Sequence, residues 1–295
     1  PRWSRRPKPR RPRVAVDLHL HSTFSDGTDE PEKIVQMAVD AGLQAIALTD
    51  HDNLDGIARA RRAAAATDLD VISGTELSVG WNDTAMHLLV YFLEPESGPL
   101  QDKLAEIQHG RATRNERIVG RLHELGMDIT FAEVFDEASG TGIGRPHFAA
   151  VMVRKGYATD IGDAFDRFLA TGRPAYLPRQ RLDALEAIDL ARASGAVAAI
   201  AHPHTLGVGA EDFATAFTGL TEAGLGGIEA YYGEYEPSLR DHIARLCRQL
   251  GIAATGGSDY HGSYKPNLAV GTGRGDLKVP YSCVEALEAQ RAGNR

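Results

Sequence analysis

Short apolar runs rich in β-branched residues alternate with amphipathic helical segments from residue 14 onward. This alternation is expected of a parallel β-sheet whose strands are joined by helices. The strands that it predicts are residues 13–19, 45–50, 71–77, 87–92, 196–202, 227–231 and 253–256. The helices that it predicts include residues 30–41, 54–67, 183–193 and 237–250. The 295 residues are enough for one α/β barrel, which commonly needs about 250, together with a modest insertion.

The stretch from about residue 100 to residue 174 breaks this rhythm, because it is helical and charged and lacks convincing strands. We predict that residues 100–174 form an inserted helical subdomain, and that residues 14–99 and 175–292 form a discontinuous barrel. Residues 1–13 carry seven basic and no acidic side chains and four prolines, which predicts a disordered basic tail.

The chain has no stretch of roughly 20 apolar residues that could span a bilayer, and its first residues lack the apolar core of a signal peptide. We therefore expect a cytoplasmic protein without a membrane partner. Cys247 and Cys283 are the only cysteines, so a disulfide framework is improbable. The chain also lacks a Gly-x-Ser-x-Gly elbow and a Gly-rich P-loop, so a serine hydrolase or a P-loop NTPase finds no support.

Polar side chains stand where successive apolar runs end, in VAVDLHLHSTFSDG, AIALTDHDN, VISGTELS, AIAHPH and ATGGSDYH. In α/β barrels that edge of the sheet is the active face. His19 and His21 are two residues apart in an extended chain, so both imidazoles project from one face and can hold one ion together. Asp259 and His261 repeat this spacing. The complete set of candidate metal ligands is His19, His21, Asp26, His51, Glu76, His87, His202, Asp259 and His261.

Each of these motifs alone has a structural explanation, such as a turn or a helix cap. Together they would crowd several charges, a repulsion that is normally tolerated only when cations neutralise it. The net charge of −8 becomes −15 without the basic tail, and bound cations would also reconcile that balance with phosphate chemistry. Asp17, Asp50 and Asp52 lie beside the candidate ligands and are expected either to orient imidazoles or to serve turn chemistry.

The segments HLHSTFSDGT, LTDHD, GTELS, AHPH and GSDYH resemble the PHP (polymerase and histidinol phosphatase) family in order and separation, from about residue 14 to residue 273. The resemblance implies a distorted seven-stranded α/β barrel that holds two or three divalent metal ions. The helical insertion and its GRPHFA segment resemble a stand-alone branch that hydrolyses nucleotide phosphates, including nucleoside 3′,5′-bisphosphates, with 5′-3′ exonuclease action on short RNA in some members.

The resemblance also implies how the ligands are shared among the ions. It assigns a first ion to His19, His21, Glu76 and Asp259, a second to Glu76, His87 and His202, and a third to Asp26, His51 and His261. The implied catalytic residues are Asp26, His51, Glu76, His202, Asp259 and His261. Imidazole and carboxylate ligands suit Mn²⁺, Fe²⁺ or Zn²⁺, and the resemblance favours Mn²⁺. A metal-activated water is the expected nucleophile, without a covalent enzyme intermediate.

Arg145 and His147 stand at a predicted helix start in GIGRPHFAAVMV, where an arginine fork and the helix N-terminus suit a phosphate. Capping of that helix is the structural alternative. His204 is a further candidate for substrate binding, and Lys155, Arg173 and Arg179 are weaker ones. Tyr231, Tyr232 and Tyr235 are expected either to stack on a base or to pack in the core.

The leading hypothesis is a phosphatase that removes the 3′-phosphate of a nucleoside 3′,5′-bisphosphate such as pAp and also trims short RNA from its 5′ end. Its substrate is a nucleotide or a short RNA, and no obligatory protein partner is expected. One alternative is a phosphatase for another small metabolite such as histidinol phosphate, against which the insertion argues. Another is a catalytically silent, metal-stabilised binding module, against which the complete ligand set argues.

Overall fold

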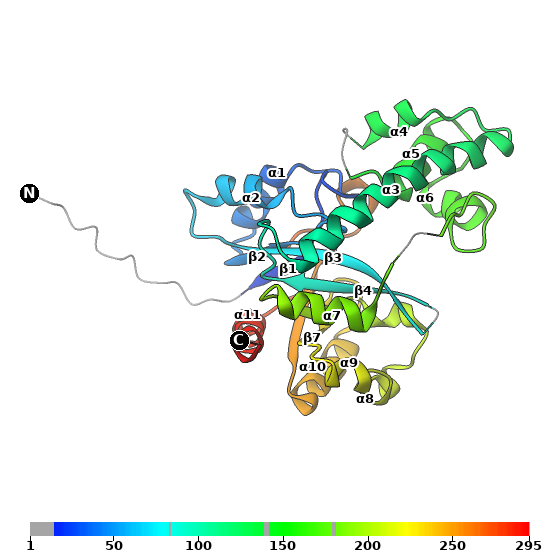
Figure 1. Cartoon of the computed structure of the whole chain (residues 1–295). Helices are drawn as coiled ribbons and strands as arrows, with labels where there is room; N and C mark the ends of the chain where they lie inside the picture. Colours follow the sequence, from blue (N-terminus) through cyan, green and yellow to red (C-terminus); the bar gives the residue numbers. More distant parts are fainter. Residues whose placement is uncertain (1–14, 83, 139–141, 179–180, 295) are drawn as a thin grey trace, which may run out of the picture.

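The computed structural model describes residues 15–82, 84–138, 142–178 and 181–294 (Figure 1). The predicted basic tail at residues 1–13 lies outside these ranges. The described strands are β1 (Val16–Leu20), β2 (Ala45–Leu48), β3 (Asp70–Trp81), β4 (Thr84–Tyr91), β5 (Leu182–Asp183), β6 (Val197–Ile200), β7 (Gly227–Tyr232) and β8 (Ala253–Gly257).

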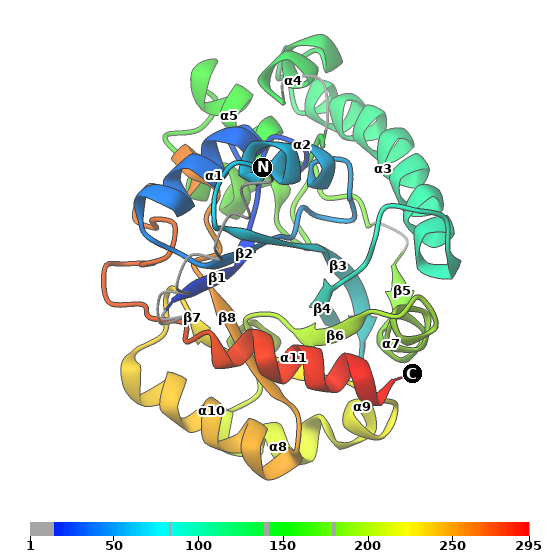
Figure 2. The same ribbon diagram turned by 90° about the vertical axis from the view of Figure 1, so that its left-hand side faces the viewer.

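Seven of these strands form a nearly closed barrel, which confirms the predicted fold class. Their order is β1-β2-β3-β4-β6-β7-β8, and the short β5 pairs with β3 off this path. An isolated β-bridge between Leu20 of β1 and Tyr260, just after β8, connects the two ends of this path. Figure 2 shows the strands arranged as a ring. The seven predicted strands correspond to these seven barrel strands, with β3 extending further than residues 71–77.

The direction of one strand, β4, differs from the predicted parallel sheet. β4 is antiparallel to β3 and to β6, whereas the other pairs of neighbouring strands on the barrel path are parallel. Only residues 82 and 83 separate β3 from β4, and a parallel connection needs a crossover of a dozen or more residues. As a consequence β4 begins at the rim where the parallel strands end.

Helices on the outside and at the end of the barrel bury its apolar side chains. They are α1 (Pro31–Asp40), α2 (Ile57–Ala64), α7 (Ala184–Ala193), α8 (Phe213–Ala216), α9 (Thr218–Glu222), α10 (Pro237–Leu250) and α11 (Ser282–Gly293), with short 3₁₀ turns at Pro203–Leu206, Ala210–Asp212 and Gly262–Tyr264. Leu287 of α11 belongs to a buried cluster with Val16 and Tyr91 of the strands. Cys247 and Cys283 are both free and buried.

The described helices between residues 99 and 169 project from the barrel (Figure 1). They are α3 (Pro99–Glu124), α4 (Phe131–Glu137), α5 (Arg145–Arg154), α6 (Ile161–Ala164) and a π-helical turn (Phe165–Leu169). α3 belongs to both parts, since Leu104 packs in the barrel core and Leu122 packs with Phe148 in a separate apolar cluster. The exact boundaries at residues 100 and 174 stay a prediction.

Among the described residues, no helix combines the length and the apolar character that crossing a bilayer requires.

Candidate metal centre

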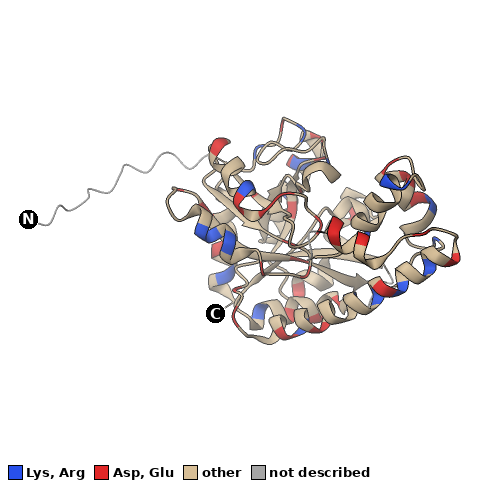
Figure 3. Ribbon diagram, turned by 90° about the horizontal axis from the view of Figure 1, so that it is seen from above, with Lys and Arg blue, Asp and Glu red and all other residues tan. Residues whose placement is uncertain are grey.

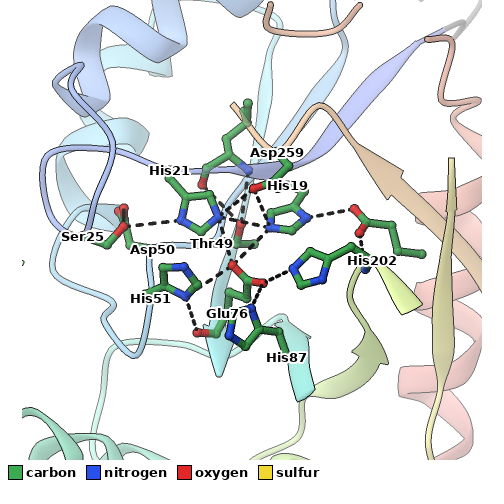
Figure 4. Close-up of polar contacts among 12 residues, drawn as sticks. His19, His21, Ser25, Thr49, Asp50, His51, Glu76, His87, His202 and Asp259 are labelled. Atoms are coloured by element: carbon green, nitrogen blue, oxygen red, sulfur yellow. Dashed lines mark hydrogen bonds and ion pairs between the residues drawn. The ribbon is translucent and has the colours of Figure 1, made fainter. Parts of the chain in front are cut away.

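The structure brings the nine candidate ligands together at the rim where the parallel strands end. Figure 4 labels all of them except Asp26 and His261. Most of them lie in or directly after strands β1, β2, β3, β6 and β8. His87 lies near the start of β4, and the antiparallel direction of that strand places it at the same rim.

The carboxylate of Glu76 is the centre of the cluster. Its Oε1 lies 2.8 Å from His87 Nδ1 and 2.8 Å from His202 Nε2. Its Oε2 lies 3.1 Å from His21 Nε2 and 3.3 Å from His19 Nε2. A carboxylate can accept several hydrogen bonds, and that of Glu76 is nearly fully buried. Its two oxygens therefore bring ring nitrogens of four histidines close together.

The contact between His19 and His21 indicates a cation. Their Nε2 atoms lie 3.1 Å apart, and Asp259 Oδ1 lies 3.4 Å from each. At most one proton fits between two imidazole nitrogens, so at least one lone pair faces the space that these atoms share. Ligand atoms of His19, His21, Glu76 and Asp259 all lie within 4.8 Å of one another, and this donor set fits a divalent ion.

A second group surrounds Asp26, in the loop after β1. Ligand atoms of Asp26, His21, His51 and His261 lie within 4.8 Å of one another. His261 Nδ1 lies 2.9 Å from the carbonyl oxygen of Asp259, so this nitrogen carries the proton and Nε2 is left to face Asp26 Oδ1 at 3.3 Å. Asp26 Oδ1 is buried and makes no hydrogen bond within the described part of the chain. A buried carboxylate oxygen in this position fits a cation.

A third group consists of His51, Glu76 and His87. The resemblance placed His202 rather than His51 with Glu76 and His87, and His202 does contact the same carboxylate oxygen as His87. The cluster therefore offers two or three overlapping sites, and the assignment of each residue to one ion stays a prediction.

The electrostatics of the cluster follow from burial and charge. Burial alone would raise the pKa values of Asp26, Glu76 and Asp259, but interactions with the neighbouring histidines, and with Lys265 at Asp259, hold all three well below their usual range. Burial opposes the charged form of His21, yet hydrogen bonds to Asp259 and Glu76 raise its pKa to about 9. Burial dominates at His51 and lowers its pKa to about 3. Without a bound cation, the imidazole of His21 is therefore protonated on both nitrogens and positively charged at neutral pH.

Glu229 in β7 orients the cluster from behind, and the sequence analysis missed it. This carboxylate is fully buried. Its Oε1 lies 2.8 Å from His19 Nδ1, and its Oε2 accepts a 2.7 Å hydrogen bond from the backbone N–H of His202. The first contact keeps the proton of His19 on Nδ1 and turns Nε2 toward His21 and Asp259. The signal was present in the sequence, because GIEAYY places one acid inside an otherwise apolar strand.

The three aspartates that were expected beside the ligands mainly organise backbone. Asp17 accepts hydrogen bonds from the N–H groups of Ser258 and Gly271, and burial raises its pKa to about 6. Asp50 accepts from the N–H of Ser22 and from the hydroxyl of Ser25, and that hydroxyl lies 3.4 Å from His21 Nδ1.

Asp52 accepts a hydrogen bond from the N–H of Ser78 and forms an ion pair with Arg111 of α3. The Asp52 contact therefore joins the rim of the barrel to the helical insertion.

Asp259 is held by two residues that the sequence analysis did not assign to the cluster. The hydroxyl of Tyr232 donates to its Oδ2 at 2.8 Å, and Lys265 Nζ forms an ion pair with the same oxygen. Tyr232 is buried, so the structure favours the packing alternative over base stacking. Tyr235 is also buried and hydrogen bonds to His204, whereas Tyr231 is half-buried against the core.

A cavity of about 320 Å³ lies over the cluster and is closed on one side by the helical insertion. The barrel contributes Asp26, Glu76 and Lys265, among others, and the insertion contributes Arg145 together with Arg111, Arg114 and Phe165. The guanidinium of Arg145 donates to the carbonyl of Leu169 at 3.0 Å and lies 5.6 Å from the ring centroids of Phe165 and Tyr176. Its charge is thus held in place, as a phosphate site requires.

Arg111 and Arg114 were missed as cavity residues. Their spacing of three along a helix puts them on one face, but no local pattern shows which part of the molecule that face contacts. His147 and His204 are not among the described residues that line this cavity. His147 Nδ1 accepts from the N–H of Gly144 at 2.9 Å and so caps α5, the alternative that the sequence left open. Contact of these two histidines with substrate stays a prediction.

The weaker basic candidates also fall outside the described lining of this cavity. Lys155 pairs with Glu133 on the insertion, and Arg173 is exposed. Arg179 lies outside the described residues.

Comparisons with known proteins agree with this geometry. The model of the PHP domain matches residues 17–130. The 5′-3′ exoribonuclease Rnm of Salmonella typhimurium is 30% identical over 250 residues, which are 84% of this chain and 85% of that protein. The 3′,5′-nucleoside bisphosphate phosphatase of Chromobacterium violaceum is 30% identical over 251 residues, 83% of this chain and 87% of that protein. The crystal structure of a predicted metal-dependent phosphoesterase from Bifidobacterium adolescentis has a TM-score of 0.83 at 28% identity, covering 95% of this chain and 97% of that one. The likeness therefore includes the insertion as well as the barrel.

Proposed function

The chain belongs to the PHP family of metal-dependent phosphoesterases, and we propose that it hydrolyses the 3′-phosphate of nucleoside 3′,5′-bisphosphates such as pAp, and also acts on short RNA from the 5′ end. The observation that carries this proposal is the cavity that joins two kinds of phosphate site. The metal-ligand cluster forms its floor, and Arg111, Arg114 and Arg145 of the insertion form its wall. A substrate with two phosphates can occupy both.

We propose a cluster of two or three ions, with Mn²⁺ favoured and Zn²⁺ or Fe²⁺ as alternatives, held by the nine candidate ligands. Divalent ions supply Lewis acidity to phosphoryl oxygens and favour the deprotonation of water near neutral pH. The names of the two relatives support the nucleotide substrate, since one is a bisphosphate phosphatase and the other a 5′-3′ exoribonuclease.

The residues of the chain itself perform the remaining tasks. Glu229 fixes the imidazole of His19, and Tyr232 and Lys265 fix the carboxylate of Asp259, so the donor atoms are arranged before substrate arrives. Arg145 binds the phosphate that is not cleaved. His202 or His261 donates a proton to the leaving alkoxide when that imidazole is not holding an ion.

The two alternatives to this function have less support. A phosphatase for a substrate with a single phosphate, such as histidinol phosphate, has no use for the three arginines that line the cavity wall. A catalytically silent, metal-stabilised binding module does not account for a complete set of nine candidate ligands that faces a cavity lined by arginines. We also propose a cytoplasmic location, which the two free buried cysteines support, and no obligatory protein partner.

The test is phosphate release from pAp, 3′-AMP, 5′-AMP and histidinol phosphate by the protein loaded with Mn²⁺. We expect a preference for pAp, and Arg145→Ala should lower kcat/KM for pAp by about 10-fold or more, because a hydrogen bond between charged groups contributes about 1.5–3 kcal/mol. The matched control is Arg154→Ala on the same helix, which removes an exposed ion pair with Glu137. Equal turnover of histidinol phosphate, insensitive to Arg145→Ala, would reassign the protein to metabolite phosphatases.

A further inference from the structure

A second cavity, of about 400 Å³, lies between α3 and the segment that contains β5 and the start of α7. It shares Arg111 and Arg114 with the cavity over the metal-ligand cluster. The two cavities therefore adjoin along α3, which Figure 1 shows running from the barrel toward the other helices of the insertion.

The basic residues of this cavity form a row that leads away from the cluster. Arg111, Arg114 and Arg117 are each three residues apart on α3, so they share one helix face. At a rise of 1.5 Å per residue, the row covers roughly 9 Å along the helix axis. Arg181 lines the same cavity from the opposite side.

The charge of the second cavity is unlike that of the chain as a whole. Its lining contains five basic side chains, because Lys103 joins the four arginines, and two acidic ones, Glu106 and Glu186. The chain carries a net charge of −8, and basic and acidic residues are interspersed over its helices (Figure 3). A local excess of cations inside an acidic protein indicates an anionic ligand.

Two of these arginines have hydrogen-bonding capacity to spare. Arg117 is exposed and makes no ion pair within the described ranges of the chain. Arg181 Nε is buried and has no hydrogen-bond partner in the same part of the molecule. By contrast, Lys103 pairs with Glu106, and Arg111 with Asp52. A guanidinium that lines a cavity without an ion pair, as that of Arg117 does, is suited to phosphate oxygens.

We propose that the second cavity binds the phosphodiester backbone of an RNA substrate, on the 3′ side of the nucleotide that is held at the metal-ligand cluster. This inference rests on the proposed function, because the 5′ end must lie at the cluster. Ile107 and Leu182 add apolar surface for the sugar or base. A nucleoside bisphosphate reaches only the first cavity, whereas a longer strand also contacts Arg117 and Arg181.

The experiment compares KM and kcat for pAp and for 5′-phosphorylated RNA of two to six nucleotides, with the full chain loaded with Mn²⁺. We expect Arg117→Glu to raise KM for the hexanucleotide about 10-fold and to change kcat/KM for pAp less than twofold. Arg181→Gln should act in the same direction. For each phosphate contact that is lost, the dependence of log KM on log salt concentration should weaken by about 0.7. The matched control is Arg121→Glu, since Arg121 is an exposed arginine on the same helix that pairs with Glu124 outside both cavities.

The outcomes separate this inference from the proposed function. If the wild-type protein hydrolyses neither pAp nor RNA, the proposed function fails and the inference fails with it. If the wild-type protein hydrolyses both, but Arg117→Glu and Arg181→Gln leave the hexanucleotide KM unchanged, the inference alone is overturned. An equal fall in kcat/KM for pAp and for the hexanucleotide would also overturn it, because these arginines would then serve the first cavity.

Discussion

The carboxylate of Glu229 joins two parts of the cluster that are far apart in sequence. One oxygen contacts His19 of β1, and the other accepts the backbone N–H of His202 after β6. His202 has a φ of +29°, an unusual conformation for a residue other than glycine, and this hydrogen bond helps to hold it. Most of the ligands could be predicted from the sequence because they stand where apolar runs end. Glu229 was overlooked because the apolar and aromatic run continues after it in GIEAYY.

We predict that Glu229→Gln lowers metal affinity by about 10- to 100-fold, because the amide replaces a charged partner of His19 and weakens its orientation. The measurement is activity as a function of Mn²⁺ concentration. Glu234→Gln is the control, since Glu234 pairs with Arg274 away from the cluster. A metal titration identical to that of the wild type would contradict the role of Glu229.

We further predict that metal affinity rises with pH. Hydrogen bonds to Asp259 and Glu76 raise the pKa of His21 from 6.5 to about 9 against the opposing effect of burial, so the ion displaces a proton below that pH. The same shift stabilises the metal-free fold below pH 6.5, and that contribution is lost as the pH rises through about 9. Calorimetric titration with Mn²⁺ between pH 6 and 9 should show proton release and an increasing affinity. An affinity independent of pH would contradict the assignment of His21.

Among the elements, the strands were the easiest to predict and the insertion the hardest to place. Apolar runs mark the strands directly, but the two-residue connection that makes β4 antiparallel is visible only in the structure, because the predicted strands 71–77 and 87–92 were shorter than β3 and began later than β4. The position of α3 and α5 over the cluster is a tertiary result. The local sequence of α3 shows an arginine-bearing face, but only the packed structure shows that this face meets the metal-ligand cluster.

The loop before α5 depends on a glycine where it meets the loop after β1. Gly142 has a φ of +60°, and a Cβ there would lie 2.4 Å from the carbonyl oxygen of Phe24. We predict that Gly142→Ala lowers the thermal midpoint more than Gly126→Ala does. Gly126 has a φ of +79° with open space around it, so alanine there meets only the left-handed backbone cost of about 1–2 kcal/mol. Equal effects of the two substitutions would show that the two loops are not in contact.

The whole molecule combines a barrel that supplies the candidate metal ligands with an insertion that supplies Arg111, Arg114 and Arg145 to the same cavity. Its fold class and the meeting of the candidate ligands at one rim follow from the sequence, because parallel strands all end at the same edge. The sequence also placed one candidate phosphate contact, Arg145, in the insertion, whereas the position of Arg111 and Arg114 in the same cavity follows only from the structure. The central claim is that the cluster is a metal centre for phosphate ester hydrolysis.

The most direct test is phosphate release from pAp by the metal-stripped protein, before and after Mn²⁺ is restored. We predict negligible release without metal, recovery with Mn²⁺, and a loss of at least about 100-fold in Asp259→Asn at saturating Mn²⁺, because Asp259 faces both His19 and His21. Full activity of the stripped protein, or of Asp259→Asn, would contradict the claim.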